Sequence, residues 1–153
     1  MRRVAASRAS FDSDGVALWQ EPYTNSDTLV EGGTLVFAPD GGLLLGGRRP
    51  LVDGGALSIE RIDELGAPIA LPSGAFSGPA PVFSPSMALD SEANLVVATC
   101  HLPDEWRQLW LQKFDLSGQA VWSEPVSPEW PGHVIVQDLA VSMTDDIAIV
   151  GTT

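Results

Sequence analysis

The residues best suited to chemistry are few in this sequence. It holds one cysteine and two histidines, and Cys100 directly precedes His101. A catalytic thiol and its base must face each other, but adjacent residues of a strand point to opposite faces. We therefore expect Cys100 to be a buried structural thiol and expect no catalytic residues. A lone cysteine with His101 and His133 also supplies a disulfide or a zinc site poorly.

Ten of the twenty acidic residues are concentrated in short segments that read DSDG, APDGG, DELG, DSEAN, DLSG and SMTDD. These ten are Asp12, Asp14, Asp40, Asp63, Glu64, Asp90, Glu92, Asp115, Asp145 and Asp146. Oxygen-rich turns suit Ca²⁺, so weak calcium binding is one interpretation. However, none of them has the ligand spacing of a dedicated calcium loop, and Asp and Gly are the default turn residues. We expect structural turns and no cofactor, with Ca²⁺ as the alternative.

The segments around these turns recur along the chain. One kind reads FDSDGVALW (11–19), IDELGAPIA (62–70) and FDLSGQAVW (114–122), with spacings of 51 and 52 residues. The other reads LVFAPDGGLLLGG (35–47), MALDSEANLVVAT (87–99) and LAVSMTDDIAIVG (139–151), with a spacing of 52 both times. Two alternating segment types with one shared period indicate an internal repeat.

Each segment consists of two short apolar runs around a polar centre, which is the pattern of a β-hairpin. In the first kind, an Asp opens the turn and a Gly three residues later suits a left-handed backbone. The runs 43–45, 95–97 and 147–150 are apolar at every position. They read as strands buried on both faces, with a short buried helix as the alternative. Twelve prolines and fifteen glycines also leave little room for long helices.

Each period thus predicts four strands, an inner apolar hairpin followed by an outer one. Four-stranded sheets repeated radially form a β-propeller, so we expect an all-β propeller segment with blades of about 52 residues. The whole chain, 1–153, is then a single repeat domain. Residues 1–33 form an outer hairpin and a link, 34–85 and 86–134 form two blades, and 135–153 form an inner hairpin. We expect Trp19 and Trp122 to pack between neighbouring sheets; Ala70 stands at the equivalent position of the middle copy.

The outer hairpins, and LWLQKFDLSGQAVW (109–122) above all, resemble bacterial β-propeller repeats of the SBBP and delta-60 type. They are less similar to the tryptophan motif of PQQ-type propellers, in which the Asp-to-Gly spacing is one residue longer. The resemblance covers all three copies. It implies an exported or cell-surface bacterial protein, usually without known enzymatic activity, and it supplies no catalytic residues.

Composition excludes several classes of function. The 153 residues carry a net charge of −12, which disfavours binding to a phosphate backbone. Hydrophobic residues make up 44% of the chain, too many for a disordered acidic tail. No apolar run is long enough to span a membrane, and residues 1–10 lack the apolar stretch of a secretory signal.

Three blades' worth of strands do not close a propeller ring, since rings have about four to eight blades. We expect one of two completions. The chain is part of a longer propeller, or a second copy closes a six-bladed ring in which each N-terminal outer hairpin completes the partner's last blade. The abrupt ends within a repeat favour the longer protein.

The links between hairpins, about 20–33, 48–56, 71–85, 101–108 and 123–134, are longer and more varied than the turns. Irregular loops on a rigid scaffold commonly carry binding residues. The candidate ligand-face residues in these links are Tyr23, Arg48, His101, Trp106, Trp130 and His133. Aromatic side chains in Pro-rich links suit stacking on a sugar or a peptide, and packing over blade edges is the alternative.

These features favour a non-enzymatic scaffold or binding module. The alternative is a propeller lyase or hydrolase acting on carbohydrate, with its site on the same long-link face. An enzyme of that kind needs polar side chains on the innermost strands. LVF (35–37), MAL (87–89) and LAV (139–141) are apolar, and Asp138 is the only charged residue directly before one of them.

Overall fold

The computed structural model describes residues 6–23, 31–51, 54–78, 83, 85–102, 107–128 and 134–152. Within them the chain is all-β, as predicted, with eleven strands and no helix. No described segment is therefore a helix able to cross a membrane. The strands are β1 (Ala6–Phe11), β2 (Ala17–Tyr23), β3 (Glu31–Phe37), β4 (Leu43–Leu51), β5 (Gly54–Ile62), β6 (Pro68–Ile69), β7 (Ser86–Leu89), β8 (Leu95–His101), β9 (Gln108–Phe114), β10 (Ile135–Val141) and β11 (Ile147–Thr152).

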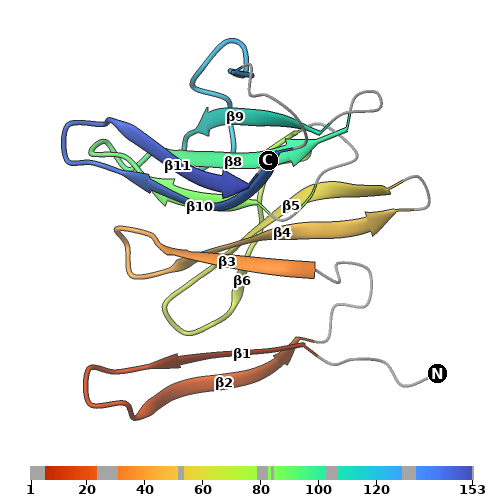
Figure 1. Ribbon diagram of the computed structural model, residues 1–153. Coiled ribbons are helices and arrows are strands. Elements are labelled where there is room, and N and C mark those ends of the chain that lie inside the picture. The colour runs from red at the N-terminus through yellow and green to blue at the C-terminus, as the bar shows by residue number, and fades with distance from the viewer. Residues whose placement is uncertain are drawn as a thin grey trace.

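The strands form four antiparallel sheets that follow one another along the chain (Figure 1). Their strand orders are β1-β2, β3-β4-β5-β6, β7-β8-β9 and β10-β11. Every described hairpin pairs strands that are adjacent in sequence, as the segment patterns predict. Strand β7 contacts both β3 and β10, so the first strands of three successive sheets lie next to one another.

The hairpin turns share one backbone geometry. In each of six turns, the first residue donates its N–H to the carbonyl four residues on and accepts a hydrogen bond from the N–H three residues on. The first residues are Asp12, Ala38, Asp63, Asp90, Asp115 and Ser142. The residue three positions later has a positive φ in every case, and these residues are Gly15, Gly41, Gly66, Ala93, Gly118 and Asp145. The left-handed glycines predicted for the outer hairpins are confirmed.

Two apolar clusters hold neighbouring sheets together. The first joins β3–β6 to β7–β9 through Leu44, Ile59, Phe76, Met87, Leu95, Val97, Trp110 and Phe114. The second joins β7–β9 to β10–β11 through Val96, Ala98, Cys100, Leu109, Leu111, Val134, Val136 and Leu139. Alternate residues of β8 enter opposite clusters, so this strand is buried on both faces, as predicted from its apolar run.

Trp19 packs across a sheet boundary, as predicted. Its indole Nε1 donates to the Glu64 carbonyl at 3.2 Å, and its ring lies against Gly66 of the next outer turn. Trp122 likewise packs against the cluster that includes β10.

Ala70 stands where the predicted repeat has a tryptophan, and Phe76 makes a comparable contact with an outer turn. Phe76 is buried, its N–H donates to the Gly118 carbonyl at 2.9 Å, and its ring packs edge-on against Phe114 with centroids 5.5 Å apart. The adjacent Ala75 lies against Gly118. Phe76 thus lies at the turn around Gly118, as Trp19 lies at the turn around Gly66.

Strand β11 departs from the prediction. Its run 147–150 was expected to be buried on both faces, but exposed and part-buried residues alternate along it. The reason is that among the described residues only one face of β10–β11 has a neighbouring sheet.

The link expected at 48–56 is also wrong. Strands β4 and β5 continue in register from Leu43↔Ile62 to Leu51↔Gly54, which leaves only residues 52–53 between them. The pairing extends this far because Gly54, Gly55 and Ala56 present little side chain to the facing strand. The first link is shorter than expected as well, since β3 begins at Glu31.

The third sheet lacks a regular fourth strand, although residues 120–122 have strand-like composition. Only two isolated bridges, Phe114↔Ala120 and Leu111↔Val126, continue the sheet beyond β9 in the described residues. Their registers differ, so the chain bulges between them. Pro125 lies in this stretch and has no N–H to donate to a ladder.

Candidate ligand-binding face

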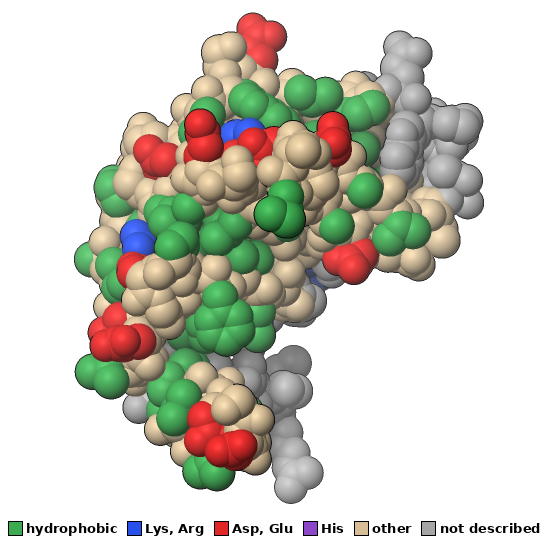
Figure 2. Space-filling view, turned by 90° about the vertical axis from the view of Figure 1, so that its left-hand side faces the viewer, with side chains coloured by type: hydrophobic (Ala, Val, Ile, Leu, Met, Phe, Trp, Pro, Cys, Tyr) green, Lys and Arg blue, Asp and Glu red, His purple; other side chains and the backbone are tan. Residues whose placement is uncertain are grey.

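The stacked sheets have two unlike ends. We call the end that carries the six turns the turn end, on the left in Figure 1, and the opposite end, where β4 and β8 end and β5 and β9 begin, the link end. Figure 2 looks onto the turn end and shows acidic side chains spread over it among apolar ones.

The acidic residues of the turn end are engaged in the turns themselves. One carboxylate oxygen of Asp12, Asp63, Asp90 and Asp115 accepts the N–H groups two and four residues on, at 2.7–3.0 Å. The Ser142 hydroxyl accepts the corresponding two N–H groups of its turn. These contacts account for the aspartates as turn residues. Among the described residues, no group of three His, Cys, Asp or Glu side chains is arranged to hold a metal ion.

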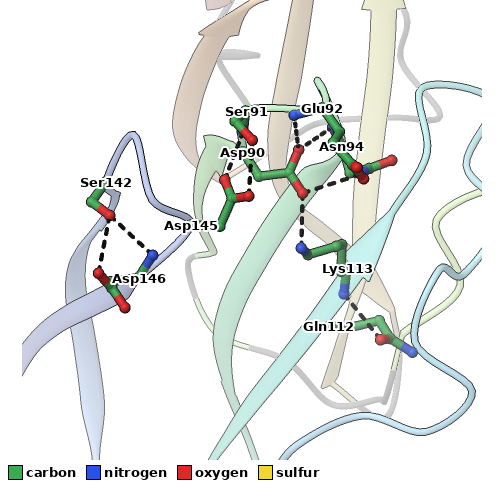
Figure 3. Close-up of polar contacts among 9 residues, drawn as sticks. All are labelled: Asp90, Ser91, Glu92, Asn94, Gln112, Lys113, Ser142, Asp145 and Asp146. Atoms are coloured by element: carbon green, nitrogen blue, oxygen red, sulfur yellow. Dashed lines mark hydrogen bonds and ion pairs between the residues drawn. The ribbon is translucent and has the colours of Figure 1, made fainter.

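Charged contacts also join and brace the turns (Figure 3). The Asp145 carboxylate accepts both the N–H and the hydroxyl of Ser91 at 2.8 Å, which ties the β10–β11 turn to the β7–β8 turn. Asp90 is buried and pairs with the Lys113 ammonium at 2.8 Å. Burial raises the pKa of Asp90, but hydrogen bonds from Lys113 and Asn94 outweigh it and lower the pKa below 3.8.

Two further acidic residues are stabilised in the charged form. The Gly42 N–H, and then the Arg61 guanidinium, lower the pKa of Asp40. The Ser117 hydroxyl is the main cause of the lowered pKa of Asp115. Arg61 also donates to the Leu116 carbonyl at 3.2 Å, so it links its own sheet to the next outer turn. The turn end is therefore a charged surface whose turns are held together by hydrogen bonds and ion pairs among their own residues.

At the link end, the structure places only some of the predicted ligand-face residues. Arg48 lies within β4 and not in a loop, which corrects the prediction for that residue. His101 is the last residue of β8 and pairs with Gln108. Tyr23 ends β2, and its side chain is outside the described part of the chain. Trp106, Trp130 and His133 also lie outside the described residues.

A glycine on the facing strand makes room for the Arg48 side chain. A Cβ atom at Gly55 would collide with the Arg48 side chain, so the aliphatic part of Arg48 lies across the space that Gly55 leaves open. The side chain is half-buried. This geometry fixes its aliphatic stem on the β4–β5 hairpin near the link end.

His101, at the link end, is partly buried, and burial changes its pKa. Its Nε2 atom is inaccessible to solvent, and no hydrogen-bond partner for it is present among the described residues. Burial lowers the pKa of His101 below 6.5, so the imidazole is neutral at physiological pH. A neutral imidazole can either donate or accept a hydrogen bond through Nε2.

The neighbouring Cys100 is a buried structural thiol, as predicted. Its Sγ accepts the Val136 N–H at 3.2 Å and lies in the apolar cluster against β10. Burial raises the pKa of Cys100, which keeps the thiol protonated and a weak nucleophile. Cys100 and His101 therefore do not present the activated thiolate that a nucleophilic site requires.

No pattern in the sequence indicated a role for Phe83, which the structure places beside β8. The Phe83 N–H donates to the Cys100 carbonyl at 2.9 Å, and its own carbonyl accepts the Thr99 hydroxyl. The Arg107 guanidinium lies over the Phe83 ring, 4.0 Å from its centroid. Phe83 stands in the Pro-rich segment PVFSP (81–85), where no periodic pattern distinguishes it.

Compared with known proteins, the chain matches no family model, and no curated protein is significantly similar to it.

Proposed function

We propose that this chain forms part of a β-propeller and acts as a non-enzymatic binding module whose link end holds the ligand. The proposal depends mainly on the sheet β3-β4-β5-β6, a four-stranded antiparallel meander in strand order. The neighbouring sheets share its spacing along the chain, since β4, β8 and β11 begin 52 residues apart at Leu43, Leu95 and Ile147. The contacts of β7 with β3 and β10 suit the innermost strands around a propeller axis.

The contrast between the two ends supports the link end as the binding face. At the turn end, side chains satisfy the backbone of the turns and tie neighbouring turns together. The link end has a neutral, half-buried His101 and the stacked pair Arg107 and Phe83. In the sequence, Trp106 and Trp130 lie in two of the predicted links. Tryptophan and polar side chains in the same links favour a sugar as the proposed ligand.

By resemblance to exported bacterial repeats, we also propose that the protein works outside the cell or at its surface. A carbohydrate lyase or hydrolase at the same face is the competing proposal. It predicts that oligosaccharides bound at the link end are cleaved.

Nuclear magnetic resonance of the ¹⁵N-labelled chain tests the binding proposal with a panel of soluble oligosaccharides. We expect shift changes at the amides of His101, Arg107 and their neighbours, and none at Gly15, Gly66 and Gly118 of the turn end. The sugar signals should stay unchanged over time. Changes restricted to the turn end, or no changes with any sugar, would contradict the proposal, and appearance of shorter sugars would indicate an enzyme.

Trp106→Ala and Trp130→Ala should each weaken binding of the active sugar at least tenfold, because stacking on an indole contributes a large share of sugar affinity. Trp19→Phe is the matched control, since Trp19 contacts the turn end. An equal loss in the control variant would point to a folding defect and not to a contact with the ligand.

A further inference from the structure

Two sheets of this structure are incomplete in complementary ways. The sheet β10-β11 has the strand order of the first half of β3-β4-β5-β6, and β1-β2 has the order of the second half. In the complete sheet the two halves join by pairing of β4 with β5. Among the described strands, β11 and β1 have no partner at the corresponding edges. Unpaired edges of this kind are templates for strand addition.

The register of that missing pairing follows from the two sheets that have it. Leu43 at the start of β4 pairs with Ile62, and Leu95 at the start of β8 pairs with Phe114. Ile62 and Phe114 each directly precede the Asp that opens an outer turn, and Phe11 holds the same place before Asp12. By equivalence, Ile147 at the start of β11 pairs with Phe11. Continued antiparallel, the register pairs all of 147–152 with all of 6–11, so neither strand overhangs the other.

Phe11, on β1, is more exposed than the residues at the equivalent positions of the complete pairings. Ile62 and Phe114 are 0% and 2% exposed, whereas Phe11 is 60% exposed. Ile62 and Phe114 each have a paired strand beside them, β4 and β8, and Phe114 also packs against Phe76. Pairing with β11 supplies that strand to Phe11.

The open face of β3 shows the same incompleteness one sheet further on. Leu35 and Phe37 are 63% and 71% exposed, whereas Met87, at the position of Leu35 in β7, is 5% exposed. Strand β7 contacts β3, but among the described residues the face of β3 that carries Leu35 and Phe37 is exposed. A β10–β11 hairpin joined to β1 would lie next to this face, just as β7 lies next to β10.

We propose that β11 of one copy pairs with β1 of a second copy, in the register Ile147↔Phe11 to Thr152↔Ala6. The inference rests on the proposed propeller arrangement and commits to a second copy because one sequence carries both complementary half-sheets. The reciprocal pairing closes the ring with two-fold symmetry and completes two sheets of order β10-β11-β1-β2. It also covers Leu35 and Phe37 of each copy.

Disulfide cross-linking tests the register. Ser10 and Ala148 are opposite each other in the proposed pairing, and both are small. In a Cys100→Ala background, Ser10→Cys with Ala148→Cys should yield a disulfide-linked species of twice 16.2 kDa under mild oxidation. The matched control is Ser10→Cys with Thr152→Cys. It shifts the second thiol four residues along the strand, about 13 Å, which exceeds the reach of a disulfide.

The outcomes of the cross-linking experiment separate the possibilities. A linked dimer with the first pair and little with the control supports the pairing. A disulfide within a single chain would show that a chain's own β1 reaches its β11 and would overturn the role of the second copy. No linkage, or equal linkage in both pairs, would overturn the register.

A second variant tests the interface without cysteines. Phe11→Asp should raise the dissociation constant of the dimer at least tenfold. The constant is obtained from a dilution series measured by size exclusion with light scattering. Val16→Asp is the control, because Val16 is 61% exposed in the turn of the same hairpin but outside the proposed pairing. The Phe11→Asp monomer should keep any sugar binding at the link end. A failed pairing is thereby distinguished from a failed binding proposal.

Discussion

Gly66 combines two requirements in one residue, a left-handed backbone and a close approach by the Trp19 ring. Its φ is +86°, and an added Cβ would come within 3.0 Å of the indole. Gly15 has a similar φ of +79° but nothing within 4 Å of such an atom. The two positions therefore separate the cost of backbone conformation from the cost of packing.

We expect Gly66→Ala to lower the free energy of unfolding by at least about 1 kcal/mol more than Gly15→Ala, in urea titrations. Both variants carry a backbone cost of about 1–2 kcal/mol, and only the first displaces Trp19. Repeating both substitutions in a Trp19→Ala background should remove the difference. A difference that persists there would show that Trp19 does not rest on Gly66.

The Asp90–Lys113 ion pair is the second feature at this scale. The Asp90 side chain is 1% exposed and that of Lys113 is 15% exposed, so loss of the carboxylate leaves a largely buried ammonium unpaired. We expect Asp90→Asn to lower the free energy of unfolding by about 3 kcal/mol at pH 7. Asp12→Asn is the control in an exposed turn of the same geometry and should change it by less than about 1 kcal/mol.

The same pair predicts a pH dependence. The folded-state pKa of Asp90 is lowered, so its contribution to stability is fully present above the unfolded pKa of about 3.9. That contribution is lost as the pH falls from there through the folded pKa. The stability difference between the native chain and Asp90→Asn should therefore shrink as the pH falls below about 4. A constant difference down to pH 2, measured by urea titration, would refute the assignment.

At the scale of elements, short-range patterns predicted the hairpins well. Asp and Gly at fixed offsets specify a local turn, and Gly15, Gly66 and Gly118 all adopt the left-handed backbone. Long-range burial was harder to predict. The apolar run of β8 is buried on both faces, but the similar run of β11 is not, because burial depends on a neighbouring sheet that local sequence does not specify.

The candidate site was less predictable than the fold for a related reason. Arg48 was assigned to the link predicted at 48–56, yet small residues on β5 let the hairpin extend past it. His101 was selected as a candidate by residue type, but the burial of its Nε2 is a property of the packed structure. The contact between Phe83 and Arg107 joins residues that are distant in sequence and share no pattern.

Phe76 illustrates how the segment after β6 substitutes for a missing tryptophan. Its buried ring contacts Phe114, and its backbone is tied to Gly118. We expect Phe76→Ala to lower the free energy of unfolding by about 3–4 kcal/mol, because it leaves a cavity between two sheets. Leu65→Ala, in an exposed outer turn, should have little effect in the same urea titration. Similar losses for both variants would mean that Phe76 does not hold the sheets together.

At the scale of the whole molecule, net charge opposes the association of two copies, whereas apolar surface favours it. Each copy carries a net charge of −12, so association of two copies brings like charges together. The proposed pairing is formed by main-chain hydrogen bonds and by contacts of apolar side chains such as Phe11 and Leu35. Salt does not screen these interactions. Repulsion between the acidic bodies is screened within about 10 Å at 0.1 M salt and much further out at low salt.

Salt should therefore strengthen the dimer. We expect the dissociation constant, from sedimentation equilibrium, to fall at least tenfold between about 0.01 M and about 0.5 M NaCl. A dimer held by ion pairs between copies would respond in the opposite direction, because salt weakens opposite-charge contacts. The Phe11→Asp variant is the control and should remain monomeric across the series, because screening repulsion cannot restore an apolar contact that has been removed. Dissociation of the native dimer as salt rises would contradict pairing through β1 and β11.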